Sequence, residues 1–349
     1  MPSQESSTLR RRNLVSAMPL LPPLSSCRPS CYTPKAPLVA ELAAFYESLP
    51  STSGRRDPEY ATGRVFTPMM HGLLFSLSEQ ALLGLVNDPE QAEEVCRAAQ
   101  AFVSMGMAES SVESMLAADD AGFVAMGSSW LPDVPRSTIV SILANTRDRG
   151  ICVVSGKMLG VEQVPIVPRS ILSSSAARNL FRAVTPITQL LLGDEFAAMF
   201  EVQLLNARGV AERPWNFLTL NSYLGAVFRA GRLGLCPCRI TRDGGAGEGF
   251  RVHFSVHWMH KTVVSGEEAE ACREPGLCSI NAMLFQCRTE ERESICEFDV
   301  TGKQIKEGHC FFVDVSTAAD AIGMHDMLAF RWTVGVVFCL GGMCDAFPM

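Results

Sequence analysis

Two histidines that could do acid–base chemistry lie in the stretch from Phe250 to Trp258. Apolar and polar residues alternate there, which predicts a strand with His253 and His257 on its polar face. A neutral imidazole at either position could act as a general acid or base. Four residues of strand separate their backbones by roughly 13 Å, too far to share one metal ion easily. Both are candidate catalytic residues, and a purely structural role is the alternative for His257.

Glu162 is a third candidate, because a carboxylate can bind a divalent cation. A single carboxylate makes a weak cation site, and the alternative is a solvated residue of a hairpin. Glu162 precedes Pro165 by three residues, and Asn216 follows much later in the chain. Both positions belong to the family resemblance given below. Three histidines lie far from these positions in the sequence, at 71, 309 and 325. Each is expected to be a surface residue or a core residue with its hydrogen bonds satisfied.

The 13 cysteines are expected to be free thiols. The first 20 residues hold three consecutive arginines but no apolar core of signal-peptide length, so we expect a reducing, intracellular compartment, either cytoplasmic or nuclear. The spacings of Cys236, Cys238, Cys272 and Cys278 fit structural zinc poorly, which predicts no metal there. The apolar run from Trp332 to Cys344 is too short to cross a bilayer and predicts a buried helix, with no membrane partner.

The elements that position the candidate residues follow from periodicity. The β-branched runs Ile151–Val154 and Val161–Val167 surround Ser155-Gly156-Lys157, which predicts a hairpin. Residues 221–229 predict a helix over that hairpin. A second strand pair is expected at 233–240 and 250–258, and a last strand at 308–315.

Helices are expected around these strands. The stretch 75–107 divides at Asn87-Asp88-Pro89, where Asp88 suits an N-cap and Pro89 the first helical position. A helix over 137–149 ends at Gly150, and residues 171–208 are helical with an interruption at Pro186. Residues 318–344 are also largely helical.

Several of these segments together resemble the fungal HNH endonuclease family. They are Cys152-Val-Val-Ser-Gly156, Glu162-Gln-Val-Pro-Ile-Val-Pro168, the stretch from Asn216 to Phe228, and Val252 to Trp258. The order and spacing of these segments carry the resemblance, which covers roughly residues 140–345. It implies an α+β fold with a ββα-metal core, an added β-hairpin and several packing helices.

The resemblance also implies roles for three positions. In the family a first histidine is the general base that activates water, an asparagine holds the loop, and a second histidine binds a divalent metal. The matching positions are Pro165, Asn216 and Gly225. Proline cannot accept a proton, and glycine has no side chain to bind a cation. The chain is therefore expected to be a degenerate member, a pseudoenzyme in which only the asparagine is retained and no metal cofactor is bound.

Three regions are expected: a disordered leader over 1–36, a helical N-terminal region over 37–135, and an HNH nuclease-like domain over 136–349. The leader is rich in Ser, Pro and Arg. The helical region is expected to dock on the main domain or to mediate dimerisation, and the oligomeric state stays open.

Charge argues against strong nucleic-acid binding, since the net charge is −7. Residues 143–264, however, carry 14 Lys and Arg against 8 Asp and Glu. That excess is either chance variation or the remainder of a phosphate-binding face. Nucleic acid is thus a possible but weak partner, and a small-molecule ligand is the other.

Three functional hypotheses follow. The first is a degenerate HNH protein that acts by binding or regulation. The second is an HNH-like scaffold recruited as an isomerase, cyclase or lyase of fungal secondary metabolism, using a pocket near Pro165, Gly225 and the His253/His257 face. The third is a divergent but active DNA endonuclease built from Glu162, Asn216 and a relocated histidine.

Overall fold

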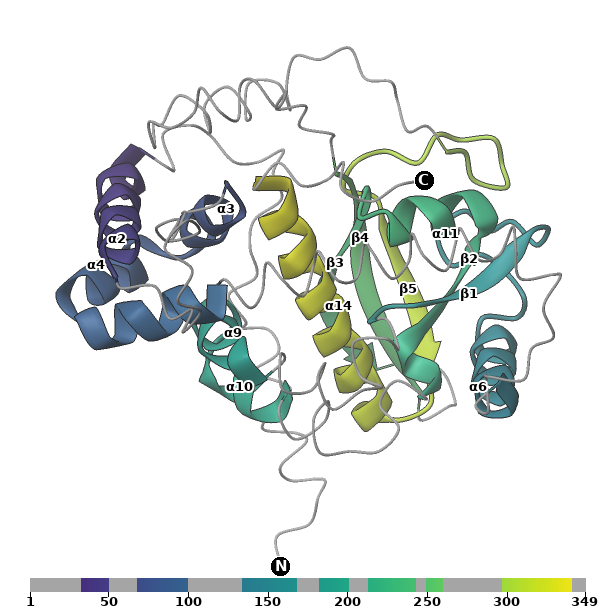
Figure 1. Cartoon of the computed structure of the whole chain (residues 1–349). Helices are drawn as coiled ribbons and strands as arrows, with labels where there is room; N and C mark the ends of the chain where they lie inside the picture. The colour runs from purple at the N-terminus through teal and green to yellow at the C-terminus, as the bar shows by residue number, and fades with distance from the viewer. Residues whose placement is uncertain are drawn as a thin grey trace, which may run out of the picture.

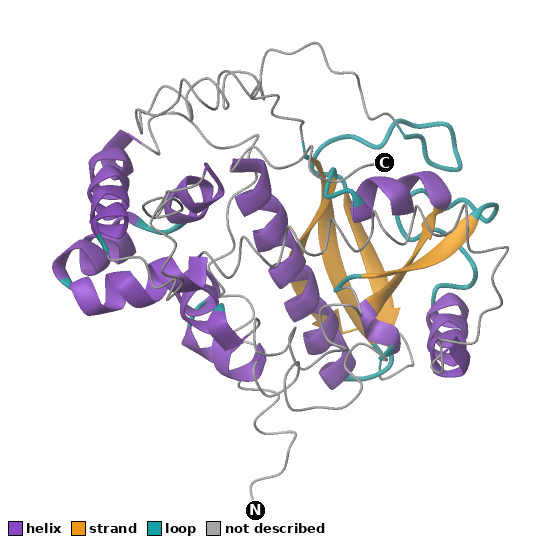
Figure 2. Ribbon diagram, in the orientation of Figure 1, coloured by secondary structure: helices purple, strands orange, loops and turns teal. Residues whose placement is uncertain are grey.

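The computed structural model describes residues 33–49, 68–99, 134–167, 182–200, 213–242, 249–259 and 297–340. Within these ranges the protein is a mixed α+β structure with two small antiparallel sheets (Figures 1 and 2). The predicted α+β class is confirmed. Residues 1–32 of the predicted leader, Cys272 and Cys278 lie outside the described residues.

The first sheet pairs β1 (Val161–Pro165) with β2 (Phe217–Asn221) in antiparallel register. Helix α11 (Ser222–Arg229) begins directly after β2. The side-chain oxygen of Asn221 accepts a hydrogen bond from the Leu224 backbone N–H at 2.8 Å, which is the N-cap geometry. The predicted helix is present, but it contacts β1 and β2 rather than the predicted 151–167 hairpin.

The partner predicted for β1 was wrong. Ile151–Val154 is not a strand: Cys152 N–H donates to Lys157 O at 2.8 Å, and Gly156 N–H donates to Cys152 O at 2.9 Å. These local bonds fold the segment into tight turns, and Gly156 takes a positive φ of 72°. Backbone groups that are satisfied locally cannot also form a ladder with β1, so that strand pairs instead with β2, more than 50 residues later.

The second sheet has the order β3–β4–β5 and is antiparallel throughout. Its strands are β3 (Leu233–Arg242), β4 (Phe250–Trp258) and β5 (Cys310–Val315). A register shift between Pro237 and Arg239 makes Cys238 an extra residue in β3. The apolar face of β4 is buried as the alternation predicted, with Val252, Phe254 and Val256 fully inaccessible.

The N-terminal helices begin with a short 3₁₀ turn, η3 (Thr33–Lys35), followed by α2 (Ala36–Ser48) and α3 (Pro68–Ser76). Next come α4 (Glu79–Asn87) and a helix over 89–99. The Asp88 carboxylate accepts from Gln91 N–H at 3.1 Å, which confirms its predicted capping role.

Three further helices are α6 (Val134–Arg147), α9 (Thr185–Leu192) and α10 (Asp194–Phe200). Helix α6 contacts β1 and β2, whereas α9 packs against α10. Gly150 N–H donates to Asn145 O at 2.8 Å, which confirms the predicted end of α6. Pro186 lies in the first turn of α9, directly after a break at Val184 that separates α9 from helical residues 182–183, so the predicted interruption is confirmed. A proline is compatible with the first turn because an N–H there has no intrahelical acceptor.

The last helix, α14 (Ala318–Leu340), lies between the N-terminal helices and the sheets (Figure 1). It contacts α3 on one side and β3 on the other, and Trp332 is almost completely buried. Buried residues of the N-terminal helices, both sheets and α14 form one continuous core. Among the described helices, none is both long and apolar enough to cross a membrane.

Candidate functional site

Asn216 ends the short 3₁₀ turn η7 (Pro214–Asn216), immediately before β2, and is fully buried. Its side-chain Nδ2 donates to Val167 O at 3.0 Å, and its Oδ1 accepts from Val167 N–H at 3.1 Å. The Asn216 backbone O accepts a third bond, from Ile166 N–H at 2.7 Å. One amide side chain thus ties the segment that leaves β1 to the start of β2, across 49 residues of sequence.

Gly225 lies in α11 directly against the Glu162 side chain of β1. A Cβ at this glycine would lie 2.1 Å from Glu162 Oε1 and 3.1 Å from Val164 Cγ2. Glu162 Oε1 is also 2.8 Å from Arg229 Nη2, one turn further along α11. The absence of a side chain at Gly225 therefore allows a carboxylate–guanidinium pair to lie over this part of the helix.

The residues around Gly225 do not fit a divalent metal. Pro165 pairs with Phe217 at the end of β1 and offers no donor side chain, and Glu162 is paired with a cation. In the part of the chain that the structure describes, no group of three or more His, Cys, Asp or Glu side chains could hold a metal ion. No step through a bound metal is therefore derived for this site.

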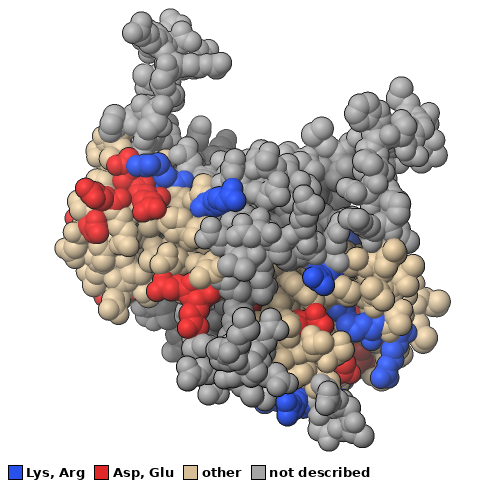
Figure 3. All heavy atoms as spheres, turned by 90° about the horizontal axis from the view of Figure 1, so that it is seen from below, with Lys and Arg blue, Asp and Glu red and all other residues tan. Residues whose placement is uncertain are grey.

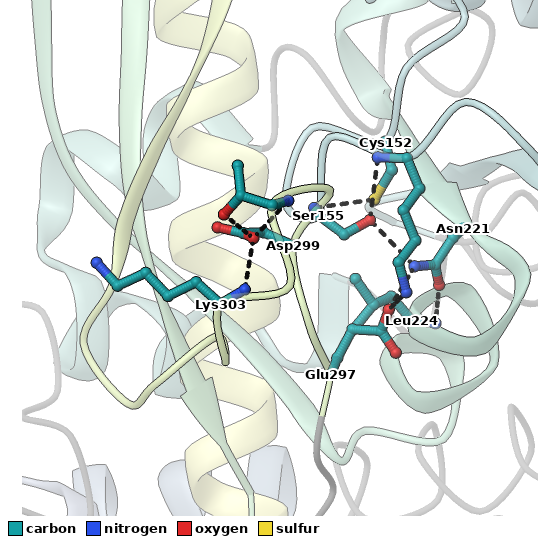
Figure 4. Close-up of polar contacts among 9 residues, drawn as sticks. Cys152, Ser155, Asn221, Leu224, Glu297, Asp299 and Lys303 are labelled. Atoms are coloured by element: carbon teal, nitrogen blue, oxygen red, sulfur yellow. Dashed lines mark hydrogen bonds and ion pairs between the residues drawn. The ribbon is translucent and has the colours of Figure 1, made fainter.

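A buried polar network joins three segments beside this sheet (Figure 4). Asn221 Nδ2 donates to Ser155 Oγ at 3.1 Å and to Glu297 Oε1 at 3.2 Å. Glu297 also forms an ion pair with the Lys157 ammonium. The Cys152 thiol, itself buried, accepts from Ser155 N–H at 3.3 Å. Each of these polar groups has a partner within the network. The network therefore has a structural role: it holds together the 152–157 turns, the start of α11 and the 297–300 segment.

Nothing in the sequence indicated that Glu297 is buried or that it takes part in this network. It is only 8% exposed. Its partner Lys157 is 140 residues away, and no local pattern signals such a contact. The adjoining turn of Figure 4 is exposed: Asp299 accepts bonds from Thr301 and Lys303, and the bond from the Thr301 hydroxyl is the main cause that lowers the pKa of this carboxyl.

His257 is buried and hydrogen bonded through both ring nitrogens. Nε2 lies 2.8 Å from Ser255 Oγ, and Nδ1 lies 2.7 Å from Glu307 Oε1. The other carboxylate oxygen, Glu307 Oε2, accepts from Trp258 N–H at 2.8 Å. The imidazole packs against Trp332 with ring centroids 5.0 Å apart. We name this chain of bonds the Ser255–His257–Glu307 relay; sequence reasoning identified only its histidine.

His253 has separate partners on the same strand face. Its Nε2 lies 2.9 Å from Thr241 Oγ1, and its ring lies 5.8 Å from that of Phe312. Burial lowers the pKa of this imidazole, and the nearby charges of Arg239 and Arg251 lower it further. His253 is thus held toward its neutral form.

The predicted site residues therefore do not form one site. Glu162 lies in β1 and pairs with Arg229, whereas both histidines lie in β4 of the other sheet and have partners of their own. Asn216 is occupied with backbone groups. The structure instead separates three places: the Glu162–Gly225 contact, the network around Ser155, and the relay at His257.

The basic excess of residues 143–264 is partly neutralised by ion pairs. On the face shown in Figure 3, basic and acidic side chains lie next to one another at several places. Two of the acidic partners, Glu297 and Asp314, lie outside residues 143–264. The pairs are Arg147–Asp148, Lys157–Glu297, Arg229–Glu162 and Arg251–Asp314.

No protein-family model, no curated protein and no solved structure matches this chain. The resemblance to the HNH family stays a prediction that rests on the sequence segments given above.

Proposed function

We propose that the unit β1–β2–α11 is a ββα-metal scaffold that has lost metal-dependent phosphodiesterase chemistry and now acts by binding or regulation. The observation that carries the proposal is the contact at Gly225. The position of the second catalytic histidine of the family has no side chain, and Glu162, held by its ion pair with Arg229, fills the space that a side chain there would need.

The expected loss of activity is large. Removing a general base costs about 10² to 10⁴ in rate. Removing a metal ligand also removes transition-state charge stabilisation worth several kcal/mol. A chain with proline and glycine at these two positions has neither contribution, so it should show no standard nuclease activity.

Two observations support the scaffold assignment. The order strand, strand, helix is present in β1, β2 and α11. Asn216 holds the backbone at Val167, the kind of loop-holding role that the resemblance implies for it. The role of a retained asparagine in a scaffold without catalytic histidines is then structural.

The test is a plasmid-nicking assay with the full chain in the presence of Mg²⁺, Mn²⁺ or Ni²⁺. We expect no cleavage by the wild type. Because Glu162 would clash with a new side chain at Gly225, the variant Pro165→His/Gly225→His should stay inactive, and adding Glu162→Ala should permit metal-dependent cleavage. Wild-type nicking that disappears in Asn216→Ala would overturn the proposal and favour a divergent endonuclease.

Partner binding is tested by a titration of the wild type with duplex DNA at increasing salt. The ion pairs of the basic region leave fewer free cations for phosphate, so we expect weak binding. A protein with many phosphate contacts would show a steep decrease in affinity with salt. Tight, steeply salt-dependent binding would assign the function to DNA.

A second candidate function is small-molecule chemistry on the same scaffold, as the isomerase, cyclase or lyase hypothesis requires. The specific observation in its favour is that His257 is hydrogen bonded at both nitrogens in a chain that includes a hydroxyl and a carboxylate. Such an arrangement suits proton transfer.

A further inference from the structure

The Ser255–His257–Glu307 relay has the connectivity of a nucleophilic triad. A hydroxyl is within hydrogen-bond distance of an imidazole nitrogen, and a carboxylate orients the imidazole from its other side. This is the arrangement by which serine is activated in acyl-transfer enzymes of unrelated folds. The relay uses no residue of the Glu162–Gly225 site.

The bonding pattern assigns the direction of the protons when the imidazole is neutral. A carboxylate oxygen only accepts, so His257 Nδ1 must carry the hydrogen that faces Glu307 Oε1. Nε2 is then the acceptor, and the Ser255 hydroxyl donates to it at 2.8 Å rather than to the more distant Cys236 O at 3.5 Å. This is the tautomer that a general base needs in order to take the serine proton.

The carboxylate of the relay is itself held in place. Glu307 Oε2 accepts the Trp258 backbone N–H at 2.8 Å while Oε1 faces the imidazole. The imidazole packs against Trp332 of α14. Both contacts fix the base relative to Ser255 without occupying the serine oxygen.

Ser255 lies in the central strand and is 8% exposed. Its register neighbours are Cys236 on β3 and Cys310 on β5. Cys310 and the bulged Cys238 are exposed, and Cys238 Sγ lies 3.7 Å from Ser255 Oγ. An approach to the serine from solvent would pass these two exposed thiols, and Cys238 would then be the nearest obstruction.

The neighbouring thiols are weaker candidates for the nucleophile. Burial raises the pKa of Cys236 to about 12, and burial likewise raises the pKa of Cys238 above its ordinary value. Thiolate is the nucleophilic form, so both are disfavoured near neutral pH. The relay contacts the serine hydroxyl, which leaves Ser255 as the group that is activated.

We propose that Ser255 is a nucleophile toward carboxylic esters, with His257 as general base and Glu307 as its positioning residue. Ser255 Oγ forms a bond to the carbonyl carbon while its proton passes to His257 Nε2. The bond from that carbon to the leaving oxygen breaks, and the alcohol departs with the proton from Nε2. Water then attacks the acyl-serine, giving one proton to Nε2; release of the acid returns that proton to Ser255 Oγ.

The test is covalent labelling of the full wild-type chain with an alkyl fluorophosphonate, read by intact mass and peptide mapping. The serine oxygen bonds to phosphorus, fluoride leaves, and the serine proton passes to His257. We expect one adduct, on Ser255, and none in Ser255→Ala. A wild-type protein that is unlabelled, or labelled only at another residue, overturns the proposal whatever the variants do.

Variants separate activation from folding. His257→Gln should slow labelling by about 10² to 10⁴, while His253→Gln, on the same face of β4 but outside the relay, should not change the rate. Cys238→Ala should speed labelling because it removes the nearest obstruction. Equal labelling rates for His257→Gln and wild type, with both folded by circular dichroism, would show that the relay is only a structural brace.

The role of Glu307 is tested by a kinetic measurement that a purely structural residue would not change. With 4-nitrophenyl acetate as substrate, Glu307→Gln should lower kcat by about tenfold or more with little change in KM, and Glu307→Asp should recover part of that loss. An unchanged kcat in Glu307→Gln would remove Glu307 from the mechanism. Failure of these experiments leaves the nuclease-loss proposal untouched, because its test uses plasmid DNA and residues of the other sheet.

Discussion

At the scale of single residues, Asn216 shows how one buried amide can determine a local structure. Its side chain satisfies both the N–H and the O of Val167. A buried backbone group that loses its partner costs about 1 to 3 kcal/mol. The Asn216 side chain therefore contributes to stability mainly by satisfying these two backbone groups of Val167.

Asn216→Ala should lower the free energy of unfolding by about 2 to 4 kcal/mol, because it leaves two backbone groups of Val167 without partners. Urea denaturation followed by circular dichroism measures the change. Asn87→Ala is the matched control: its amide donates to Leu83 O at an exposed helix end and should cost less than about 0.5 kcal/mol. Equal losses in the two variants would contradict the account.

His253 predicts a pH dependence of stability. Its folded pKa is lowered from the ordinary value of 6.5, so below that pH the unfolded chain binds the proton more readily. Protonation then favours unfolding: the wild type loses stability from this group as pH falls from 6.5 toward the lowered folded pKa, and loses nothing from it above that range. His253→Gln removes this contribution.

Denaturation of wild type and His253→Gln at pH 7.5 and pH 5 measures the effect. The stability of the wild type should decrease more between the two pH values than that of the variant. An identical decrease in both proteins would show that His253 titrates alike in the folded and unfolded chains.

At the scale of elements, the packing of α11 on β1 depends on Gly225. Alanine is about 1 kcal/mol better than glycine inside a helix. Here, however, a Cβ would force the Glu162 carboxylate away from its position beside Arg229 and press on Val164. The helix preference and the contact with β1 therefore oppose each other at this position.

A double-mutant cycle separates these effects. Gly225→Ala should be more favourable to stability in the Glu162→Ala background than in the wild type, by about 0.5 to 2 kcal/mol, because the truncated side chain no longer meets the new Cβ. Thermal or urea unfolding of the four proteins gives the coupling. A coupling near zero would mean that Glu162 moves aside without cost.

At the scale of the whole molecule, α14 connects regions that are far apart in sequence. It contacts α3 and β3, and Arg331 Nη2 donates to Phe228 O and Arg229 O at the end of α11, each at 3.2 Å. The continuous core includes the N-terminal helices. The regions should therefore unfold together.

We expect one cooperative unfolding transition. The tryptophans described in the structure lie at 215, 258 and 332, outside the N-terminal helices, whereas far-ultraviolet circular dichroism reports on all helices. Midpoints from tryptophan fluorescence and circular dichroism in urea should coincide. A separate, earlier loss of helix signal would show that the N-terminal helices unfold on their own.

Much of the local structure could be predicted from the sequence. The β4 alternation correctly assigned the buried face, and Asp88 and Gly150 correctly marked the beginning of one helix and the end of another. Such features depend on side-chain periodicity and on residues a few positions apart, so the information is contained within one segment. The prediction of a hairpin from Ile151–Val154 was wrong because β-branched residues favour a strand but do not specify which segment it pairs with.

The sequence by itself determined the alternating strand, the helix caps and the absence of side-chain chemistry at Pro165 and Gly225. Only the tertiary structure decided that Glu162 lies against Gly225, that Glu297 braces Lys157, and that Ser255 and Glu307 complete a relay with His257. The residues of the pairs Glu162–Gly225, Lys157–Glu297 and His257–Glu307 are between 50 and 140 positions apart along the chain. Contacts at such separations depend on how whole elements pack, which no periodicity within a segment records.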